Sequence, residues 1–236
     1  MARTQNPNIE ILEAAVQALG PVCEDLVFLG GCATALLISD SAAPPVRATR
    51  DVDAITKIGS IAEYHELGER LRERGFDVDQ SEGALICRWT GHAILLDLMP
   101  TDEKILGFSN DWYAGAIDTA RKLLLPSGAS IRLIDAAHFL ATKLAAFDQR
   151  GDKDHVMSSD LEDVICVLDG RPELEDEIER AEADVRSYVC DRLRDLLKDT
   201  QFLEALSGHL PGDPGSQARL PDLVARLERL AATLTD

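Results

Sequence analysis

Hydrophobic and polar positions follow two different periods along residues 1–75. Apolar side chains at every third or fourth position, as between Ile9 and Leu19, are typical of an amphipathic helix, whereas short apolar or alternating runs are typical of strands. Gly20-Pro21 ends the first helical run, because both residues disfavour a helix interior. The elements predicted in order are a helix over 8–19, a strand over 25–29, a helix over 32–38, a loop over 39–49, a strand over 51–57 and a helix over 61–74.

The remaining chain has a strand-rich stretch followed by a helix-rich one. Strands are expected over 76–79, 84–90 and 92–99, and the last two are predicted to form a hairpin that turns at Thr90-Gly91. A second hairpin is expected around Pro126-Ser-Gly-Ala129. From Asp135 onward, helical spacing predicts helices over 135–148, 159–168, 173–182, 183–206 and 219–233. The pattern therefore predicts an α/β domain over 1–130 and a helical domain over 131–236.

Composition and charge narrow the functional classes. The 236 residues carry 24 Lys+Arg against 42 Asp+Glu, a net charge of −18, and 45% are hydrophobic, which is ordinary for a globular chain. An acidic surface repels phosphates at long range and so disfavours general nucleic-acid binding. No apolar run approaches the roughly 18 residues of a membrane span, and the start lacks signal-peptide order, so we expect a cytoplasmic protein without membrane contact. Five cysteines without metal-ligand spacing indicate buried, reduced thiols.

Three aspartates form the most informative pattern. Asp51 and Asp53 are two residues apart on a predicted strand, so their carboxylates share one face at a separation of roughly 6–7 Å. Such a pair repels unless a cation lies between them, and Mg²⁺ is a natural cation for carboxylate and phosphate oxygens. Asp97 lies in the apolar run HAILLDLM, where a buried, unpaired carboxylate would be costly. It is therefore expected either to face solvent at an edge or to meet a metal.

The order of these motifs resembles a known superfold. The polymerase β-like nucleotidyltransferases have a similar series of motifs: a glycine pair after a strand, here Gly30-Gly31, then a segment like RDVD at 50–53, then a single aspartate on a later strand. The chain most closely resembles the AbiEii/AbiGii-type nucleotidyltransferases of bacterial toxin–antitoxin and phage-defence systems. The matching segments are LGGCATALL at 29–37, TRDVDAI at 49–55, LLDLMP at 95–100 and the helical stretch 141–168. The resemblance implies a mixed sheet flanked by helices, followed by a helical C-terminal domain.

The resemblance also implies roles for individual residues. Asp51, Asp53 and Asp97 would be catalytic and would hold Mg²⁺ or Mn²⁺. The Gly30-Gly31 turn would bring backbone amides at a helix start close to the triphosphate of a bound nucleoside triphosphate. The reaction implied is attack of an acceptor hydroxyl on the α-phosphorus, with pyrophosphate as the leaving group.

Other polar residues are assigned with alternatives. Lys143 lies within an apolar helical stripe, so it either extends to solvent or meets an anion; the resemblance implies contact with nucleotide phosphates. Asp160, on the flank of the 159–168 helix, is implied to orient that lysine, whereas Asp163 is expected to point away. Arg50 is a candidate phosphate ligand or the partner of an acid.

Several functions fit this pattern. The first is transfer of a nucleoside monophosphate to an acceptor hydroxyl, for which the resemblance implies the 3′ end of tRNA, a growth-arresting toxin and a cognate antitoxin protein. The second is modification of a protein or a small-molecule acceptor. The charge of −18 weakens the tRNA version, because tRNA binders usually have a basic patch, unless basic residues such as Arg47, Arg50 and Lys57 converge into one around the site. The third is a catalytically inactive binding or antitoxin-like module of the same fold. Retention of the three aspartates and of Lys143 disfavours inactivity.

Overall fold

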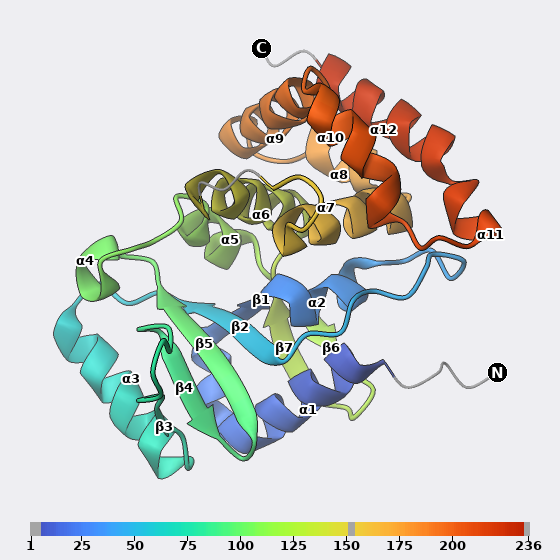
Figure 1. The fold of residues 1–236 in the computed structure, drawn as a ribbon. Helices are drawn as coiled ribbons and strands as arrows, with labels where there is room; N and C mark the ends of the chain where they lie inside the picture. The colour runs from blue at the N-terminus through green and yellow to red at the C-terminus, as the bar shows by residue number, and fades with distance from the viewer. Residues whose placement is uncertain (1–5, 151–153, 234–236) are drawn as a thin grey trace. The chain divides into compact units, whose positions relative to one another are not determined.

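A computed structural model of the chain describes residues 6–150 and 154–233. The chain divides into two compact units (Figure 1). The first, called the sheet unit, comprises Met1–Ala35 and Arg47–Asp135, and the second, called the helical unit, comprises Leu36–Val46 and Ala136–Asp236. Compared with the predicted domains, residues 131–135 stay with the sheet unit, and the segment 36–46, which contains the last two residues of a helix and the loop after it, belongs to the helical unit.

Within the described residues, the sheet unit holds one seven-stranded sheet in the order β3-β4-β5-β2-β1-β7-β6. The strands are β1 Leu26–Leu29, β2 Asp51–Thr56, β3 Asp77–Val78, β4 Arg88–Gly91, β5 Ile94–Pro100, β6 Arg121–Leu124 and β7 Ser130–Leu133. The β2–β5 and β1–β7 pairs are parallel and the other pairs are antiparallel, so the sheet is mixed. The predicted α/β class with helices beside a mixed sheet is confirmed.

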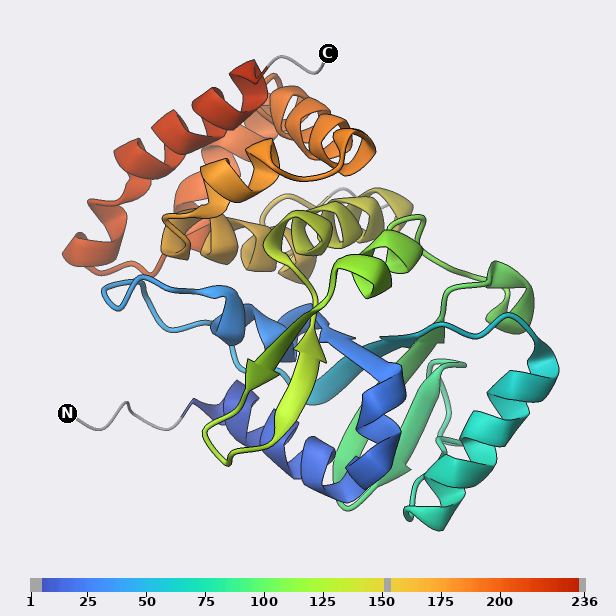
Figure 2. The ribbon, with the colours of Figure 1, turned by 180° about the vertical axis from the view of Figure 1, so that it is seen from behind.

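Helices flank this sheet. They are α1 Pro7–Leu19, α2 Gly30–Leu37, α3 Ile61–Glu73, and two short helices that were not predicted, α4 Glu103–Leu106 and α5 Tyr113–Thr119. Asn6 caps α1 with its side chain, and the apolar stripe of that helix is buried against the sheet. Figure 2 shows α1 running beside the β6–β7 hairpin, where Glu13 accepts a hydrogen bond from the backbone N–H of Ser127 at 2.6 Å. The hairpin predicted around 126–129 is confirmed.

The β4–β5 hairpin turns later than predicted. Gly91 pairs with Ile94, so the turn is His92-Ala93, whose φ angles of 53° and 61° are those of a two-residue hairpin turn. Gly91 serves packing instead, because a Cβ there would lie 2.4 Å from the carbonyl oxygen of Gly75. The predicted turn at Thr90-Gly91 is therefore wrong by two residues, and the strand begins at Arg88 rather than at residue 84.

The helical unit contains seven α-helices within its described residues. They are α6 Ala136–Arg150, α7 Ser159–Gly170, α8 Leu174–Glu179, α9 Ala183–Leu196, α10 Thr200–Ala205, α11 Pro214–Gln217 and α12 Leu220–Ala232. The single helix predicted over 183–206 is divided in two, because Asp199 leaves the helical conformation and caps α10 by accepting a hydrogen bond from Gln201 N–H. No helix in residues 6–150 or 154–233 has both the length and the apolar character needed to cross a bilayer.

Candidate functional site

The three predicted aspartates lie on one face of the sheet. Strands β2 and β5 are parallel neighbours, and Asp53 is the register partner of Asp97. Residues opposite each other in register point to the same face, and Asp51 shares that face because it is two positions from Asp53. Asp97 is only 3% exposed, between Leu96 and Leu98, which are fully buried. The sheet thus brings together side chains separated by more than forty residues in the chain.

Arg88 is the main site residue that the sequence analysis missed. It is the β4 register partner of Asp97, and its guanidinium donates from Nε to Oδ1 at 2.7 Å and from Nη2 to Oδ2 at 2.6 Å. The same Nη2 donates to Oδ2 of Asp51 at 3.0 Å. The hydrogen bonds to Asp97 raise the pKa of Arg88. A turn at Thr90-Gly91 would place Arg88 opposite Ala93, so the error in the turn concealed this pair.

Asn8 forms hydrogen bonds to two segments near the aspartates, one at Gly31 and one at 47–49. Its side chain is fully buried, and its Nδ2 donates to the carbonyl oxygens of Gly31 at 3.3 Å and Arg47 at 2.8 Å. Its Oδ1 accepts from Thr49 N–H at 3.0 Å. The Thr49 hydroxyl in turn donates to Oδ1 of Asp51 at 2.6 Å. A residue on α1 therefore orients Asp51 through Thr49. The sequence offered no signal for Asn8 beyond a polar residue at the start of a helix.

The glycine turn accommodates an aspartate. Gly30 has φ +72° and begins α2 directly after β1. A Cβ on Gly30 would lie 1.8 Å from Oδ2 of Asp53, so only glycine leaves room for that carboxylate. The partial positive charge at the start of a helix favours a carboxylate in this position. The turn that was predicted to approach a triphosphate therefore has a carboxylate of the protein itself, that of Asp53, lying against it.

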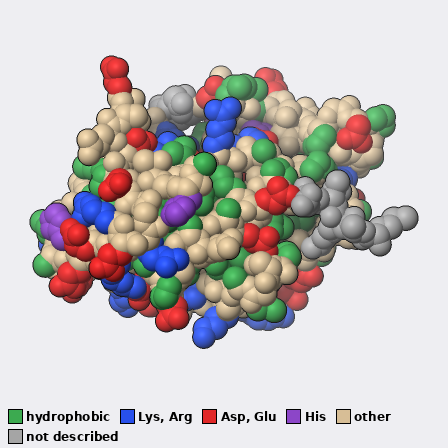
Figure 3. Space-filling model, turned by 90° about the horizontal axis from the view of Figure 1, so that it is seen from below, with side chains coloured by type: hydrophobic (Ala, Val, Ile, Leu, Met, Phe, Trp, Pro, Cys, Tyr) green, Lys and Arg blue, Asp and Glu red, His purple; other side chains and the backbone are tan. Residues whose placement is uncertain are grey.

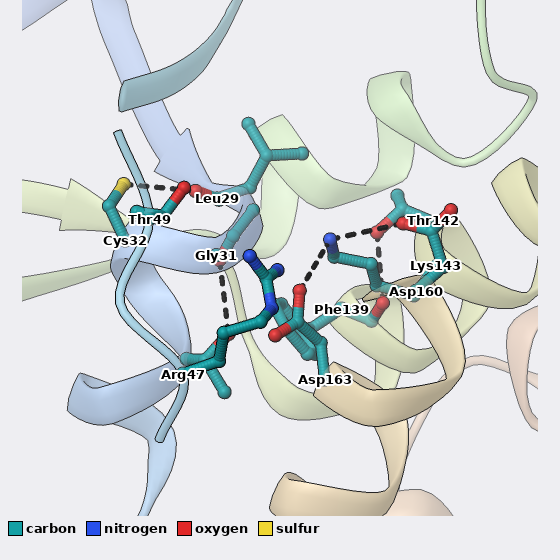
Figure 4. A network of polar contacts seen from close by, with 12 residues as sticks. Leu29, Gly31, Cys32, Arg47, Thr49, Phe139, Thr142, Lys143, Asp160 and Asp163 are labelled. Carbon is teal, nitrogen blue, oxygen red and sulfur yellow. Dashed lines mark hydrogen bonds and ion pairs between the residues drawn. The ribbon is translucent and has the colours of Figure 1, made fainter. Parts of the chain in front are cut away.

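A second charged cluster lies within the helical unit. Nζ of Lys143 on α6 lies 3.2 Å from Oδ1 of Asp160 and 2.7 Å from Oδ2 of Asp163, both on α7 (Figure 4). Arg150 reaches the other oxygen of Asp160 at 2.7 Å. The expectation that Asp163 points away is wrong: Asp163 is 3% exposed, because the face of α7 that packs on α6 includes it. Lys143 meets these carboxylates rather than extending to solvent.

Arg50 is exposed and, among the residues with described positions, has no ion-pair partner.

Burial shapes the chemistry around Asp97. The thiol of Cys87, next to Arg88 in the chain, is 3% exposed. Burial, with a further contribution from the Asp97 carboxylate, raises the pKa of Cys87 to about 12. This thiol therefore stays protonated at neutral pH and is not a nucleophile. The five cysteines form no disulfide, and Cys166 differs from the expected burial because it is partly exposed.

The donor set has the chemistry of a site for a hard divalent cation. The cluster contains three carboxylates, and carboxylate oxygens are the ligands that Mg²⁺ and Mn²⁺ prefer. In the part of the chain that the structure describes, however, no three acidic, histidine or cysteine side chains already stand in position to enclose a metal ion. The guanidinium of Arg88 bridges Asp51 and Asp97 instead.

One pocket of the sheet unit lies away from these aspartates. This pocket, of about 530 Å³, lies beyond the carboxyl ends of β2 and β5, and its polar lining includes Lys57, Thr101, Asp102 and Asn110. None of the predicted site residues lines it. The predicted catalytic residues therefore occupy a sheet face rather than this hollow.

Together, the fold and these contacts define an α/β protein with a cluster of three carboxylates and one arginine on a mixed sheet. A comparison with protein-family models finds none that matches the chain, and a comparison with curated proteins finds no match.

Proposed function

We propose that this protein is a metal-dependent nucleotidyltransferase that moves a nucleoside monophosphate from a nucleoside triphosphate to an acceptor hydroxyl. The observation that carries the proposal is the register of Asp53 with Asp97, with Asp51 on the same face and the Gly30 turn against Asp53. This order of motifs is similar to that of the polymerase β-like superfold and of AbiEii/AbiGii-type enzymes. The helical C-terminal part of that architecture is proposed for residues beyond Asp135.

In the proposed reaction, the acceptor oxygen forms a bond to the α-phosphorus and the bond from that phosphorus to the pyrophosphate oxygen breaks. Asp51, Asp53 and Asp97 would hold Mg²⁺ or Mn²⁺, which when bound offsets negative charge on the transferring phosphoryl group. Thr49 orients Asp51 by its hydroxyl hydrogen bond. Asp97 helps to activate the acceptor hydroxyl, whose proton passes to a carboxylate. The positive end of α2, at Gly30, favours negative charge on this side of the sheet.

Nucleotide binding is proposed for several cationic and backbone groups. Gly30, Gly31 and Arg50 are the candidates in the sheet unit, and Arg50 is free to meet a phosphate because it is exposed. Lys143 is the candidate in the helical unit, with Asp160 as the residue that orients it at 3.2 Å. Because Lys143 already contacts two carboxylates, a phosphate would have to replace or share one of those contacts.

The acceptor is proposed as the 3′ end of tRNA, which would make the protein a toxin with a cognate antitoxin partner. The distribution of charged side chains is relevant to the choice between a tRNA acceptor and another acceptor. On the face drawn in Figure 3, the Lys and Arg side chains of the described residues lie among Asp and Glu side chains rather than in one basic patch. Together with the net charge of −18, this intermixing supports the alternative of a protein or small-molecule acceptor. An inactive binding or antitoxin-like module is the remaining alternative.

The test is release of pyrophosphate from each nucleoside triphosphate with Mg²⁺ or Mn²⁺. Asp53→Asn keeps the shape of the side chain and removes its charge, and should slow release by more than about a hundredfold, since a metal contributes several kcal/mol to phosphoryl transfer. Asp79→Asn is the matched control, because Asp79 is a partly exposed aspartate of the same unit that caps a turn at Ser81. Equal rates for wild type and Asp53→Asn would refute the metal role.

The acceptor is identified in a second assay. Labelled triphosphate is incubated with the protein and either total tRNA or total cell protein. Transfer of label to tRNA supports the first function, and transfer to protein supports the second. Absence of pyrophosphate release with every triphosphate supports the inactive module.

A further inference from the structure

Asp97 needs a positive partner whether or not a metal is bound. It is 3% exposed and lies between two fully buried leucines on β5. A buried carboxylate without a counter-charge is strongly destabilising, so it either becomes protonated or recruits a cation. Arg88 supplies that charge from the neighbouring strand, directly opposite in register.

The contacts of Arg88 are unequal. Two nitrogens grip both oxygens of Asp97 at 2.7 and 2.6 Å, a paired geometry that fixes the guanidinium plane. The contact from Nη2 to Asp51 is longer, at 3.0 Å, and the Asp51 side chain is 33% exposed against 4% for Asp97. Water can replace Arg88 at Asp51 far more easily than at Asp97. The Asp51 contact is therefore the one that can be exchanged.

We propose that Arg88 is a resident counter-cation of Asp97 and Asp51 in this acidic cluster, and that a divalent cation binds the cluster in competition with the contact between Arg88 and Asp51. This proposal rests on one part of the proposed function, namely that the three aspartates bind a divalent cation. Arg88 releases Asp51 and keeps Asp97 when the cation binds. Since both positive groups use the Asp51 carboxylate, each weakens the binding of the other. Arg88 is thus a positioning residue that sets the metal concentration at which the cluster fills.

Removal of the guanidinium has two effects of opposite sign. Without metal, Arg88→Gln leaves Asp97 buried without its counter-charge, so the melting temperature falls. With metal, the same variant lacks the guanidinium that shares the Asp51 carboxylate with the cation, so the cation binds more tightly. A purely structural role would produce only the first effect, because a loosened cluster binds metal equally or less well.

The experiment is a titration of the protein with Mn²⁺ or Mg²⁺ alone. Metal binding is measured by calorimetry and by the metal-induced shift in melting temperature. Arg88→Gln should lower the half-saturating metal concentration about tenfold. This is the effect expected from removing one unit charge at about 6 Å from a divalent ion, even in a dielectric like that of water. Arg88→Lys, which keeps the charge without the paired geometry, should lie between wild type and Arg88→Gln. Arg70→Gln is the control, because Arg70 pairs with Asp25 at 2.6 Å in the same unit and its loss changes the net charge equally. Its half-saturating concentration should stay within about twofold of wild type, since exposed charges are screened.

The possible results distinguish the role of Arg88 from the proposed function. An unchanged or higher half-saturating concentration in Arg88→Gln, or an equal decrease in Arg70→Gln, overturns the role of Arg88 and leaves the proposed function standing. Absence of metal binding to wild type and to Arg88→Gln overturns both. If Arg88→Gln does not fold, Arg88→Lys decides alone, and a half-saturating concentration equal to that of wild type overturns the proposal. A failed pyrophosphate assay with intact metal coupling would refute only nucleotidyl transfer.

Discussion

Nζ of Lys143 on α6 lies 2.7 Å from Oδ2 of Asp163 on α7, and the lysine side chain is 14% exposed while the aspartate side chain is 4% exposed. The pair joins two helices whose remaining contacts are largely apolar. Burial makes both charges dependent on their partners, because neither can be fully hydrated in the folded chain.

Asp163→Asn should lower the free energy of unfolding by about 3 kcal/mol, because it leaves Lys143 less compensated in a buried position. Urea denaturation followed by circular dichroism measures the change. Asp148→Asn is the matched control, because Asp148 pairs with Arg192 at 2.6 Å but with 38% of its side chain exposed. The control should cost less than about 1 kcal/mol. Equal costs for the two variants would contradict the structural importance of the Lys143 cluster.

Gly30→Ala should be more harmful than alanine at another glycine of similar backbone conformation. At Gly30 the added Cβ would stand 1.8 Å from Oδ2 of Asp53, whereas at Gly83, with φ +79°, it would meet nothing within 4 Å. Gly83→Ala should therefore cost only the strain of its positive φ, about 1–2 kcal/mol, and Gly30→Ala should cost more than about 3 kcal/mol. Thermal unfolding compares the two, and similar melting temperatures would show that Asp53 moves aside freely.

Asn8→Ala should destabilise the sheet unit by about 3 kcal/mol or more. The change removes the partner that the carbonyl oxygens of Gly31 and Arg47 and the N–H of Thr49 have now, in a place that is buried at Gly31 and partly buried at the other two. Asn6→Ala, two residues earlier, removes only the cap of α1 and should cost about 1 kcal/mol. Chemical denaturation of both variants gives the difference. If Asn8→Ala is no worse than Asn6→Ala, water replaces the Asn8 amide.

Acid should weaken the helical unit through Glu175. Hydrogen bonds from Arg229, followed by the charges of Arg229 and Arg226, lower the pKa of Glu175 below its ordinary value of 4.5. A lowered folded-state pKa contributes stability that is present above the ordinary value and is lost as the pH falls through the folded value. The pKa of Asp40 is lowered in the same direction, by the backbone N–H of Ala42 and by Arg219. Both groups therefore favour a fold that is more stable at neutral than at acid pH.

The measurement is the melting temperature of wild type and Glu175→Gln between neutral pH and about pH 3. The variant should melt lower at neutral pH, and the two curves should converge as Glu175 of the wild type becomes protonated. Arg180→Gln is a control, since Arg180 pairs with Asp176 on the same helix with most of both side chains exposed. A difference between wild type and Glu175→Gln that persists at the acid end would assign the effect to packing rather than to charge.

Local pattern and tertiary contact contributed different parts of this structure. Apolar periodicity was sufficient for α1, β2, α3 and α7, since each of these elements buries one face whose spacing can be read within a few residues. The β6–β7 hairpin followed from the turn residues around Pro126-Ser-Gly-Ala129, which are also a local signal. The β4–β5 turn did not follow, because His92 and Ala93 adopt positive φ without a glycine, and the nearby Gly91 serves the close approach of Gly75.

The sequence by itself determined the α/β class and identified Asp51, Asp53 and Asp97 as candidates, because a two-residue spacing on a strand and a carboxylate in an apolar run are local facts. Only the tertiary structure decided which charges meet. Arg88 reaches Asp97 because of one hairpin register, and Lys143 reaches Asp163 because two helices pack face to face. Ion pairing depends on distances between elements far apart in the chain, and a shift of two residues in one turn is enough to change the partner.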